Sequence, residues 1–555
     1  MPKCVVLGID GGTFETLDPL IDTGRLPALA LLLRGGVRAT LLSTFPPVTT
    51  PAWPTMYTSQ DPGVHGYTSF GILDPQTLVR RAERLDGVSC PRLWTVLNQA
   101  GVRTGIFNIP STYPADVVDG FMVSGFPAPP GSREAVQPTY LRRPFTEAFP
   151  AYDCNGTIEV ALFNDPTKRD HLVQQLQQIL SQRRRALEWL LEREPVDFLW
   201  VVLETFDRIA HCAYAFLSPE SDLHGSDEGK RAYDAILDLF ETQDHIIKDV
   251  MEWAGSDSMA MVVSDHGFSW TPRRFDLRGW LISRDLMAPP RHKRLWQRFK
   301  GAVRSRLQQK GLGKFWQAVS NTHARLAKAG GRARWTGATW DWDRSKTWLS
   351  GASEYGIRIN LRGRYVHGIV PPTEYDETVD CLVDALQNVQ DPKDERPVFS
   401  LVKRREEVYH GPYVDRAPEV VYLPRRDVYQ ETRPLDSPPS AQGFLSPAPD
   451  LVSQGHHDLN GIFAATGRPF GQGQAAPLSI PDIMPTVLYA MGLGVPENLE
   501  GRVVTEVLDP GFVASHPVER SVGEAPVTRG GSSQPSYTEE EEEAIQKRLE
   551  ELGYL

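Results

Sequence analysis

The chain has 555 residues, of which 41% are apolar, so it can bury one large core or several smaller ones. Its 59 basic residues are outnumbered by 70 acidic residues, and the net charge of -11 argues against duplex nucleic acid as the main partner. Five widely separated cysteines without a Cys-x-x-Cys pair indicate neither a disulfide framework nor a structural zinc motif, which fits a cytoplasmic protein. No apolar run is long enough for a transmembrane segment.

Short apolar runs alternate with helical segments along the chain, which predicts an α/β fold with a largely parallel sheet covered on both faces. Residues 171–193 carry Leu and Ile at helical spacing and are expected to form a crossover helix. Ligands bind at the carboxyl ends of strands in such sheets, where Asp10 and Asp265 lie. The predicted strands are residues 4–10, 103–109, 197–204, 258–264, 418–423 and 461–465.

An inserted basic segment interrupts this pattern. Residues 291–340 contain 13 Lys or Arg and no Asp or Glu, with apolar residues near helical spacing. We therefore expect residues 286–344 to form a basic helical cap inserted into a discontinuous catalytic core, residues 1–285 and 345–511. A solvated basic face docked on the core is the favoured interpretation. A lid that attracts a phosphate-bearing substrate and a membrane-surface helix are the alternatives.

The tail divides into two parts by composition. Residues 512–537 are rich in Gly, Ser and Pro and are predicted to be a linker. Residues 538–555 begin with the capping box from Thr538 to Glu541 and place apolar residues on one face. We expect them to form an acidic amphipathic helix.

Two pairs of side chains that could bind metal follow predicted strands. Asp265 and His266 stand where the chain leaves a strand, so both can reach one site despite their adjacency. Asp207 and His211 are four residues apart, which puts them on one face of a first helical turn. Each pair alone could also be structural, with the Asp capping a helix beside an unrelated His. Their positions after strands favour a metal site.

Three further features could complete such a site. Asp10 closes the first strand in GIDGG, and either His456 or His457 precedes the strand at 461–465. The proline-rich segment 45–66 carries threonines at positions 49, 50, 55 and 58. A Thr hydroxyl at a helix N-terminus can attack phosphorus, because backbone N–H groups stabilise the anion and a metal lowers the hydroxyl pKa. Chemistry alone leaves the choice of threonine and of histidine open.

In this order, the motifs resemble the alkaline phosphatase superfamily, and within it the type I phosphodiesterase and nucleotide pyrophosphatase family. The resemblance covers most of residues 1–510 and implies an alkaline-phosphatase-like three-layer sandwich with a mostly parallel central sheet. It rests on GIDGG, the Thr-x-Pro-x(6)-Thr-x(3)-Pro-x-x-His-Gly run from Thr49 to Gly66, Asp207-x-x-x-His211, the Ser-Asp-His-Gly run at 264–267 and His457-x-x-x-Gly461.

The resemblance also implies roles for single residues. Thr49 matches the family nucleophile, and His457 rather than His456 matches the family ligand. Two divalent ions are implied, with Zn2+ expected from the mixed nitrogen and oxygen ligands and Mn2+ as the alternative. The implied ligands are Asp10, Thr49, Asp265 and His266 for one ion, and Asp207, His211 and His457 for the other.

One position departs from the family pattern. Phe70 stands where nucleotide pyrophosphatases have a phosphate-holding Asn, so a nucleotide substrate is not implied. Phe70 and Trp53 favour an apolar substrate pocket and therefore a diester.

The expected function is hydrolysis of a small phosphodiester or pyrophosphate through a covalent phosphothreonine. Phosphomonoester hydrolysis or phosphoryl transfer is one alternative, and a catalytically inactive binding or scaffold protein on the same fold is another. A sulfatase would need a Cys/Ser-x-Pro-x-Arg sequence, which is missing at 49–53. The sequence predicts no oligomeric state.

Overall fold

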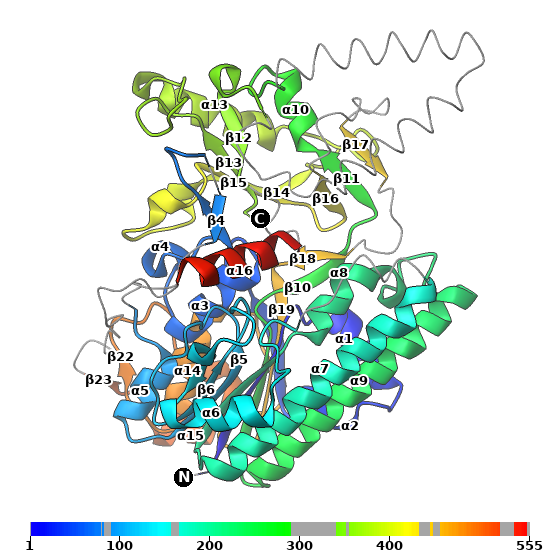
Figure 1. Ribbon diagram of the computed structural model, residues 1–555, viewed down its shortest axis with the longest axis vertical. Coiled ribbons are helices and arrows are strands. Elements are labelled where there is room, and N and C mark those ends of the chain that lie inside the picture. Colours follow the sequence, from blue (N-terminus) through cyan, green and yellow to red (C-terminus); the bar gives the residue numbers. More distant parts are fainter. Residues whose placement is uncertain are drawn as a thin grey trace.

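A ten-stranded sheet forms the base of the molecule (Figure 1). The computed structural model describes residues 2–78, 80–82, 90–156, 166–289, 340–350, 354–431, 444–447, 455–521 and 538–551. The strands follow the order β20-β2-β19-β9-β1-β8-β5-β6-β7, and β21 pairs with β2. Their bounds are Cys4–Ile9 for β1, Val37–Leu42 for β2, Thr104–Ile109 for β5, Gly120–Ser124 for β6, Val136–Gln137 for β7, Phe198–Leu203 for β8, Met259–Val263 for β9, Asn460–Thr466 for β19, Gly473–Gln474 for β20 and Leu478–Ser479 for β21.

The centre of this sheet is parallel, as the sequence predicts. β1 lies between β8 and β9 and pairs with both in parallel, and β5 continues the parallel order beyond β8. Side chains alternate between the two faces. Val5 and Leu7 enter the hydrophobic core on one face, whereas Cys4 and Val6 enter the core on the other. Because both faces are covered, these strands are continuous apolar runs.

Helices cover both faces of the sheet, which confirms the expected three-layer α/β arrangement (Figure 1). The predicted crossover helix at 171–193 lies within α7, which packs against α9. One face carries α1 (Phe14–Asp22), α2 (Pro27–Arg34), α6 (Thr139–Ala148), α7 (Pro166–Arg193), α8 (Thr205–Leu217) and α9 (Asp227–Ala254). The other face carries α3 (Thr49–Thr58), α5 (Leu93–Gln99) and α14 (Ile483–Ala490).

A second core lies beside the carboxyl-end edge of the main sheet (Figure 1). The predicted strand at 418–423 belongs here, as β15 of an antiparallel sheet, so its assignment to the parallel sheet is wrong. An apolar run predicts a buried strand, but it does not predict which sheet the strand joins. This lobe contains β11 (Arg273–Asp276), β12 (Thr347–Leu349), β13 (Gly356–Ile359), β14 (Phe399–Arg404), β15 (Val420–Pro424), β16 (Val428–Glu431), β17 (Leu445–Pro447), α10 (Leu277–Ser283) and α13 (Tyr375–Gln387).

Most of the expected basic cap, residues 290–339, lies outside the described residues. The described ends of the 286–344 segment pack into the second core through Met287, Trp340 and Trp342. A 3-10 turn spans Trp342–Arg344. No helix in the described part of the chain is long and apolar enough to cross a membrane.

The first part of the expected linker is structured instead. α15 (Pro510–Ser515) begins at Asp509, which caps the Phe512 N–H, and the Phe512 ring packs 5.7 Å from Tyr489. β23 (Arg520–Ser521) then pairs with β22 (Val495–Pro496). Residues 512–521, which the composition predicts to begin a linker, therefore include the end of a helix and a short strand. Residues 522–537 lie outside the described residues.

The helix α16 (Glu539–Glu551) follows that segment and attaches to the second core. Ile545 and Leu549 are buried there. The Tyr113 hydroxyl donates a hydrogen bond to Glu541 over 2.7 Å. Figure 1 shows α16 between the lobe and the part of the molecule that holds the main sheet.

Candidate metal centre

The carboxyl ends of three neighbouring strands place the acidic residues of the site. Asp10 follows β1, Asp265 stands two residues after β9, and Asp207 lies in the first turn of α8 after β8. The backbone N–H of Gly11 donates to Asp265 Oδ1 over 3.2 Å. Gly11 has a positive φ of 71°, and a Cβ there would lie 2.8 Å from the Phe268 ring, so only glycine allows this close approach.

Asp10, Asp265 and His266 form a first ligand group, with ligand atoms within 4.8 Å of one another. All three side chains are buried. His266 Nε2 lies 3.3 Å from Asp265 Oδ2 and 3.6 Å from Asp10 Oδ1. Thr49, the first residue of α3, places its hydroxyl oxygen 3.5 Å from the same His266 nitrogen. The structure therefore brings together the four residues expected around one ion.

Asp207, His211 and His457 form a second ligand group of the same size. Asp207 Oδ1 lies 3.3 Å from His211 Nε2 and 3.5 Å from His457 Nε2, and the two imidazole nitrogens are 2.9 Å apart. His457 lies on β18 (Gly455–Asp458), which pairs with β10 (Gly267–Trp270). Its Nδ1 is 2.9 Å from the Pro47 carbonyl, which orients Nε2 toward the group.

The neighbouring histidine turns away. His456 Nε2 lies 2.8 Å from the Tyr355 hydroxyl in the second lobe. Successive residues on a strand point to opposite faces, so only one of the two can join the ligand group. The structure places His457 there, as the motif spacing implies.

The electrostatics of the two groups fit bound cations. Burial, together with the neighbouring carboxylates Asp265 and Asp207, raises the pKa of Asp10 well above its ordinary value. Burial likewise raises the pKa of Asp265 and lowers the pKa of His266 to about 4, which keeps the imidazole neutral. Three buried carboxylate oxygens accept no hydrogen bond from any described residue: Asp10 Oδ1, Asp207 Oδ1 and Asp265 Oδ2.

Such oxygens cost free energy unless a cation or donor satisfies them. Carboxylates combined with neutral imidazoles are the ligand set that Zn2+ prefers, and Mn2+ accepts the same atoms. The residues present therefore fit two divalent ions.

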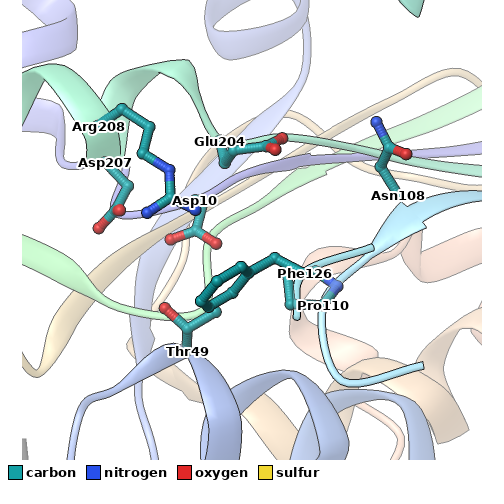
Figure 2. Close-up of a pocket in the computed structure, with 8 residues that line it drawn as sticks. All are labelled: Asp10, Thr49, Asn108, Pro110, Phe126, Glu204, Asp207 and Arg208. Atoms are coloured by element: carbon teal, nitrogen blue, oxygen red, sulfur yellow. The ribbon is translucent and has the colours of Figure 1, made fainter. Parts of the chain in front are cut away.

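A cavity lies against both ligand groups (Figure 2). Figure 2 shows the Arg208 guanidinium folded between Asp207 and Asp10, and burial leaves Arg208 only 5% exposed. The guanidinium carbon lies 5.0 Å from the centre of the Phe126 ring. Its positive charge also opposes the rise in the pKa of Asp10. The lining residues are Asp10, Thr49, Asn108, Pro110, Phe126, Glu204, Asp207 and Arg208.

Comparison with known proteins assigns the chain. A family model described as type I phosphodiesterase / nucleotide pyrophosphatase matches residues 4–444. The chain belongs to this family. It is therefore a hydrolase of the phosphodiesterase and pyrophosphatase type, acting on phosphoester bonds, and the resemblance found in the motifs is confirmed. None of the curated proteins compared with the sequence matches it.

Solved structures of similar proteins include three of ectonucleotide pyrophosphatase / phosphodiesterase 5. An inactive variant of the murine protein in complex with AMP is 15% identical, with a TM-score of 0.48 over 92% of this chain and 100% of that chain. The murine protein itself gives 15% and 0.48 over 91% and 100%. The human protein gives 14% and 0.47 over 91% and 100%.

In this phosphodiesterase-family chain, the two aromatic residues expected in the substrate pocket lie elsewhere. Trp53 is fully buried, and its indole N–H donates to Asp10 Oδ2 over 3.1 Å. Phe70 is 2% exposed and packs behind Phe126, with ring centres 5.7 Å apart. Neither residue lines the cavity. Trp53 instead orients Asp10, and Phe126 supplies the apolar wall.

Sequence reasoning missed the other lining residues. Asn108 lies at the carboxyl end of β5, and Glu204 and Arg208 flank Asp207 after β8. The rule that sites form at the carboxyl ends of parallel strands could have selected all three. Phe126 follows β6 by two residues and satisfies the same rule.

Proposed function

We propose that this chain is a hydrolase dependent on two divalent metal ions, in which Thr49 is the nucleophile. The observation that carries the proposal is the position of the Thr49 hydroxyl. Thr49 is the first residue of α3, and its hydroxyl oxygen lies 3.5 Å from His266 Nε2. Thr49 also lines the same cavity as Asp10 and Asp207. The proposed nucleophile therefore lies beside both ligand groups and lines the same cavity.

The assignment of ligands follows the two groups. Asp10, Thr49, Asp265 and His266 would hold one ion, and Asp207, His211 and His457 would hold the other. When bound, the two ions would supply positive charge that lowers the pKa of the Thr49 hydroxyl and neutralises the phosphoryl group. Zn2+ is the proposed ion and Mn2+ the alternative.

The residues of the chain then account for the reaction. Thr49 Oγ1 passes its proton to solvent water and attacks phosphorus. The bond from phosphorus to the leaving oxygen breaks, phosphothreonine forms, and the departing alkoxide takes a proton from water. The positive end of the α3 dipole and the Arg208 guanidinium stabilise the charge that develops on the phosphoryl oxygens. A water molecule then attacks the same phosphorus and the bond from phosphorus to Thr49 Oγ1 breaks. One proton of that water restores the Thr49 hydroxyl, the other passes to solvent, and the phosphorylated product leaves.

A phosphodiester is the favoured substrate, because Phe126 lines the cavity with an apolar ring that a second ester group can contact. Arg208 supports phosphomonoester hydrolysis as a second candidate, because a dianionic phosphate needs additional positive charge. Rates on bis-p-nitrophenyl phosphate and p-nitrophenyl phosphate, with Zn2+ and Mn2+ varied, distinguish the two.

Acid quenching during turnover tests the nucleophile. Mass spectrometry of the quenched wild-type protein should find a phosphoryl adduct on Thr49. Thr49→Ala should lose both adduct and turnover while binding the same amount of metal. Thr50→Ala, a change at the neighbouring buried hydroxyl, should keep most of the activity. Full activity in Thr49→Ala would refute the proposal.

A further inference from the structure

Two buried polar atoms at one side of the cavity have no hydrogen-bond partner among the described residues. They are Nδ2 of Asn108 and Oε2 of Glu204, in side chains that are 1% and 6% exposed. Both residues line the cavity that Thr49 also lines. In Figure 2, Thr49 lies on one side of the Phe126 ring and Asn108 on the other.

The surrounding contacts fix both groups in these orientations. The Tyr152 hydroxyl donates to Asn108 Oδ1 over 2.7 Å, which leaves the amide nitrogen as the remaining donor. Asn108 also has a φ of 58°, in the left-handed region that Asn adopts more readily than most residues other than glycine.

Glu204 is held just as firmly. Its Oε1 accepts a hydrogen bond from the buried Arg183 guanidinium, which balances its charge and leaves Oε2 as a free acceptor. Gly156 permits this approach, because a Cβ there would lie 2.7 Å from Arg183 and 2.9 Å from Glu204. The cavity therefore presents one oriented donor and one oriented acceptor.

The chemistry of these two atoms selects their ligand. A hydroxyl group can both donate a hydrogen bond to Glu204 Oε2 and accept one from Asn108 Nδ2, so its chemistry matches both atoms. An ammonium group cannot accept from Asn108, and an anion would meet the Glu204 carboxylate.

Resting on the proposed phosphoester hydrolysis, we infer that Asn108 and Glu204 bind a hydroxyl group on the alcohol portion of the substrate. With the phosphoryl group at Thr49, the carbon chain between them lies against the Phe126 ring. The substrates are then phosphoesters of polyols or sugars rather than of simple alkyl alcohols.

Two matched esters test this inference, p-nitrophenyl glyceryl phosphate and p-nitrophenyl propyl phosphate, which share a leaving group and differ in hydroxyl groups. The wild-type holoenzyme should favour the glyceryl ester in kcat/KM by about 10-fold or more, because a site built for a hydroxyl rejects the analogue that lacks it. Asn108→Ala should bring the two values together, chiefly by slowing the glyceryl ester.

Three further variants separate binding from structure. Tyr152→Phe keeps Asn108 but removes the bond that orients it, so it should lose part of the preference. Glu204→Gln should also lose the preference while metal content stays the same. Asn388→Ala, on the exposed end of α13, should change neither ester. Melting temperatures identify any variant that fails to fold.

The outcomes are distinct. Equal wild-type values for the two esters would mean that the two atoms bind only water, which overturns the inference and leaves the proposed function standing. Loss of one metal equivalent in Glu204→Gln would make Glu204 a metal ligand and also overturn it. Hydrolysis of neither ester would refute the proposed function itself.

Discussion

The imidazole rings of His266 and His457 stack with their centres 3.8 Å apart and their planes tilted by 23°. His266 belongs to the first ligand group and His457 to the second. The rings reach this position from different elements, the end of β9 and the strand β18. The two ligand groups are therefore in direct contact through these rings, and we expect a change in one ring to shift the other.

Substitution of His457 should therefore disturb both ligand groups. His457→Ala removes an imidazole from the second group and the stacking partner of His266, so we expect less than two metal equivalents and activity lower by more than about 100-fold. His456→Ala is the matched control, because His456 contacts Tyr355 instead. Elemental analysis and initial rates measure both effects. Equal metal content in the two variants would contradict the assignment.

Metal removal should destabilise the fold. The variant Asp265→Asn tests whether the buried carboxylate charge is the cause. Burial, followed by repulsion from neighbouring carboxylates, raises the pKa values of Asp10 and Asp265, so without cations their charged forms are unfavourable. The metal-free variant should melt above metal-free wild type at pH 7, because one buried charge is gone. Added Zn2+ should raise the melting temperature of the wild type more than that of the variant. Thermal unfolding with and without a chelator measures both of these differences in melting temperature.

Arg208→Gln should weaken catalysis without releasing metal. The guanidinium lies in the cavity and supplies positive charge for the phosphoryl oxygens, so kcat/KM should fall by about 100-fold, and inhibition by inorganic phosphate should weaken. The variant Arg25→Gln, which loses ion pairs with Asp238 and Glu241 on α9, serves as control. Unchanged phosphate inhibition in Arg208→Gln would show that Arg208 does not contact the substrate.

His65 should make the fold sensitive to acid. Burial lowers the pKa of His65 to about 3, below the ordinary 6.5, so the unfolded chain binds its proton first as the pH falls. The stability from the neutral ring is complete above pH 6.5 and declines below it, by about 1.4 kcal/mol per pH unit. In His65→Gln, which keeps a partner for the Thr55 hydroxyl, this part of the decline should be missing. Urea unfolding at pH 7 and pH 5 compares the slopes.

Sequence reasoning succeeded where chemistry is tied to the chain locally. Asp207 and His211 share a helix face by spacing alone, and Asp10 and Asp265 follow strands whose apolar runs are unmistakable. It failed where a side chain depends on distant partners. The Trp53 indole points into the protein, where its N–H donates a hydrogen bond to Asp10. No local sequence pattern around Trp53 predicts this contact with a residue far away in the sequence.

The same limit explains the pocket. Asn108 faces the cavity because β5 neighbours β8, which carries Glu204 at its end, and strand order is a property of the whole sheet. An apolar run such as 418–423 predicts a strand but leaves its partners undetermined, so β15 was assigned to the wrong sheet.

The ligand atoms come from segments as far apart in the sequence as Asp10 and His457, joined only through the order of β8, β1 and β9 and the β10–β18 pair. No short fragment of the chain carries all of these ligands, because they span residues 10 to 457. Activity in this protein therefore reports the integrity of the entire sheet, so loss of function after a remote substitution is first a question about assembly.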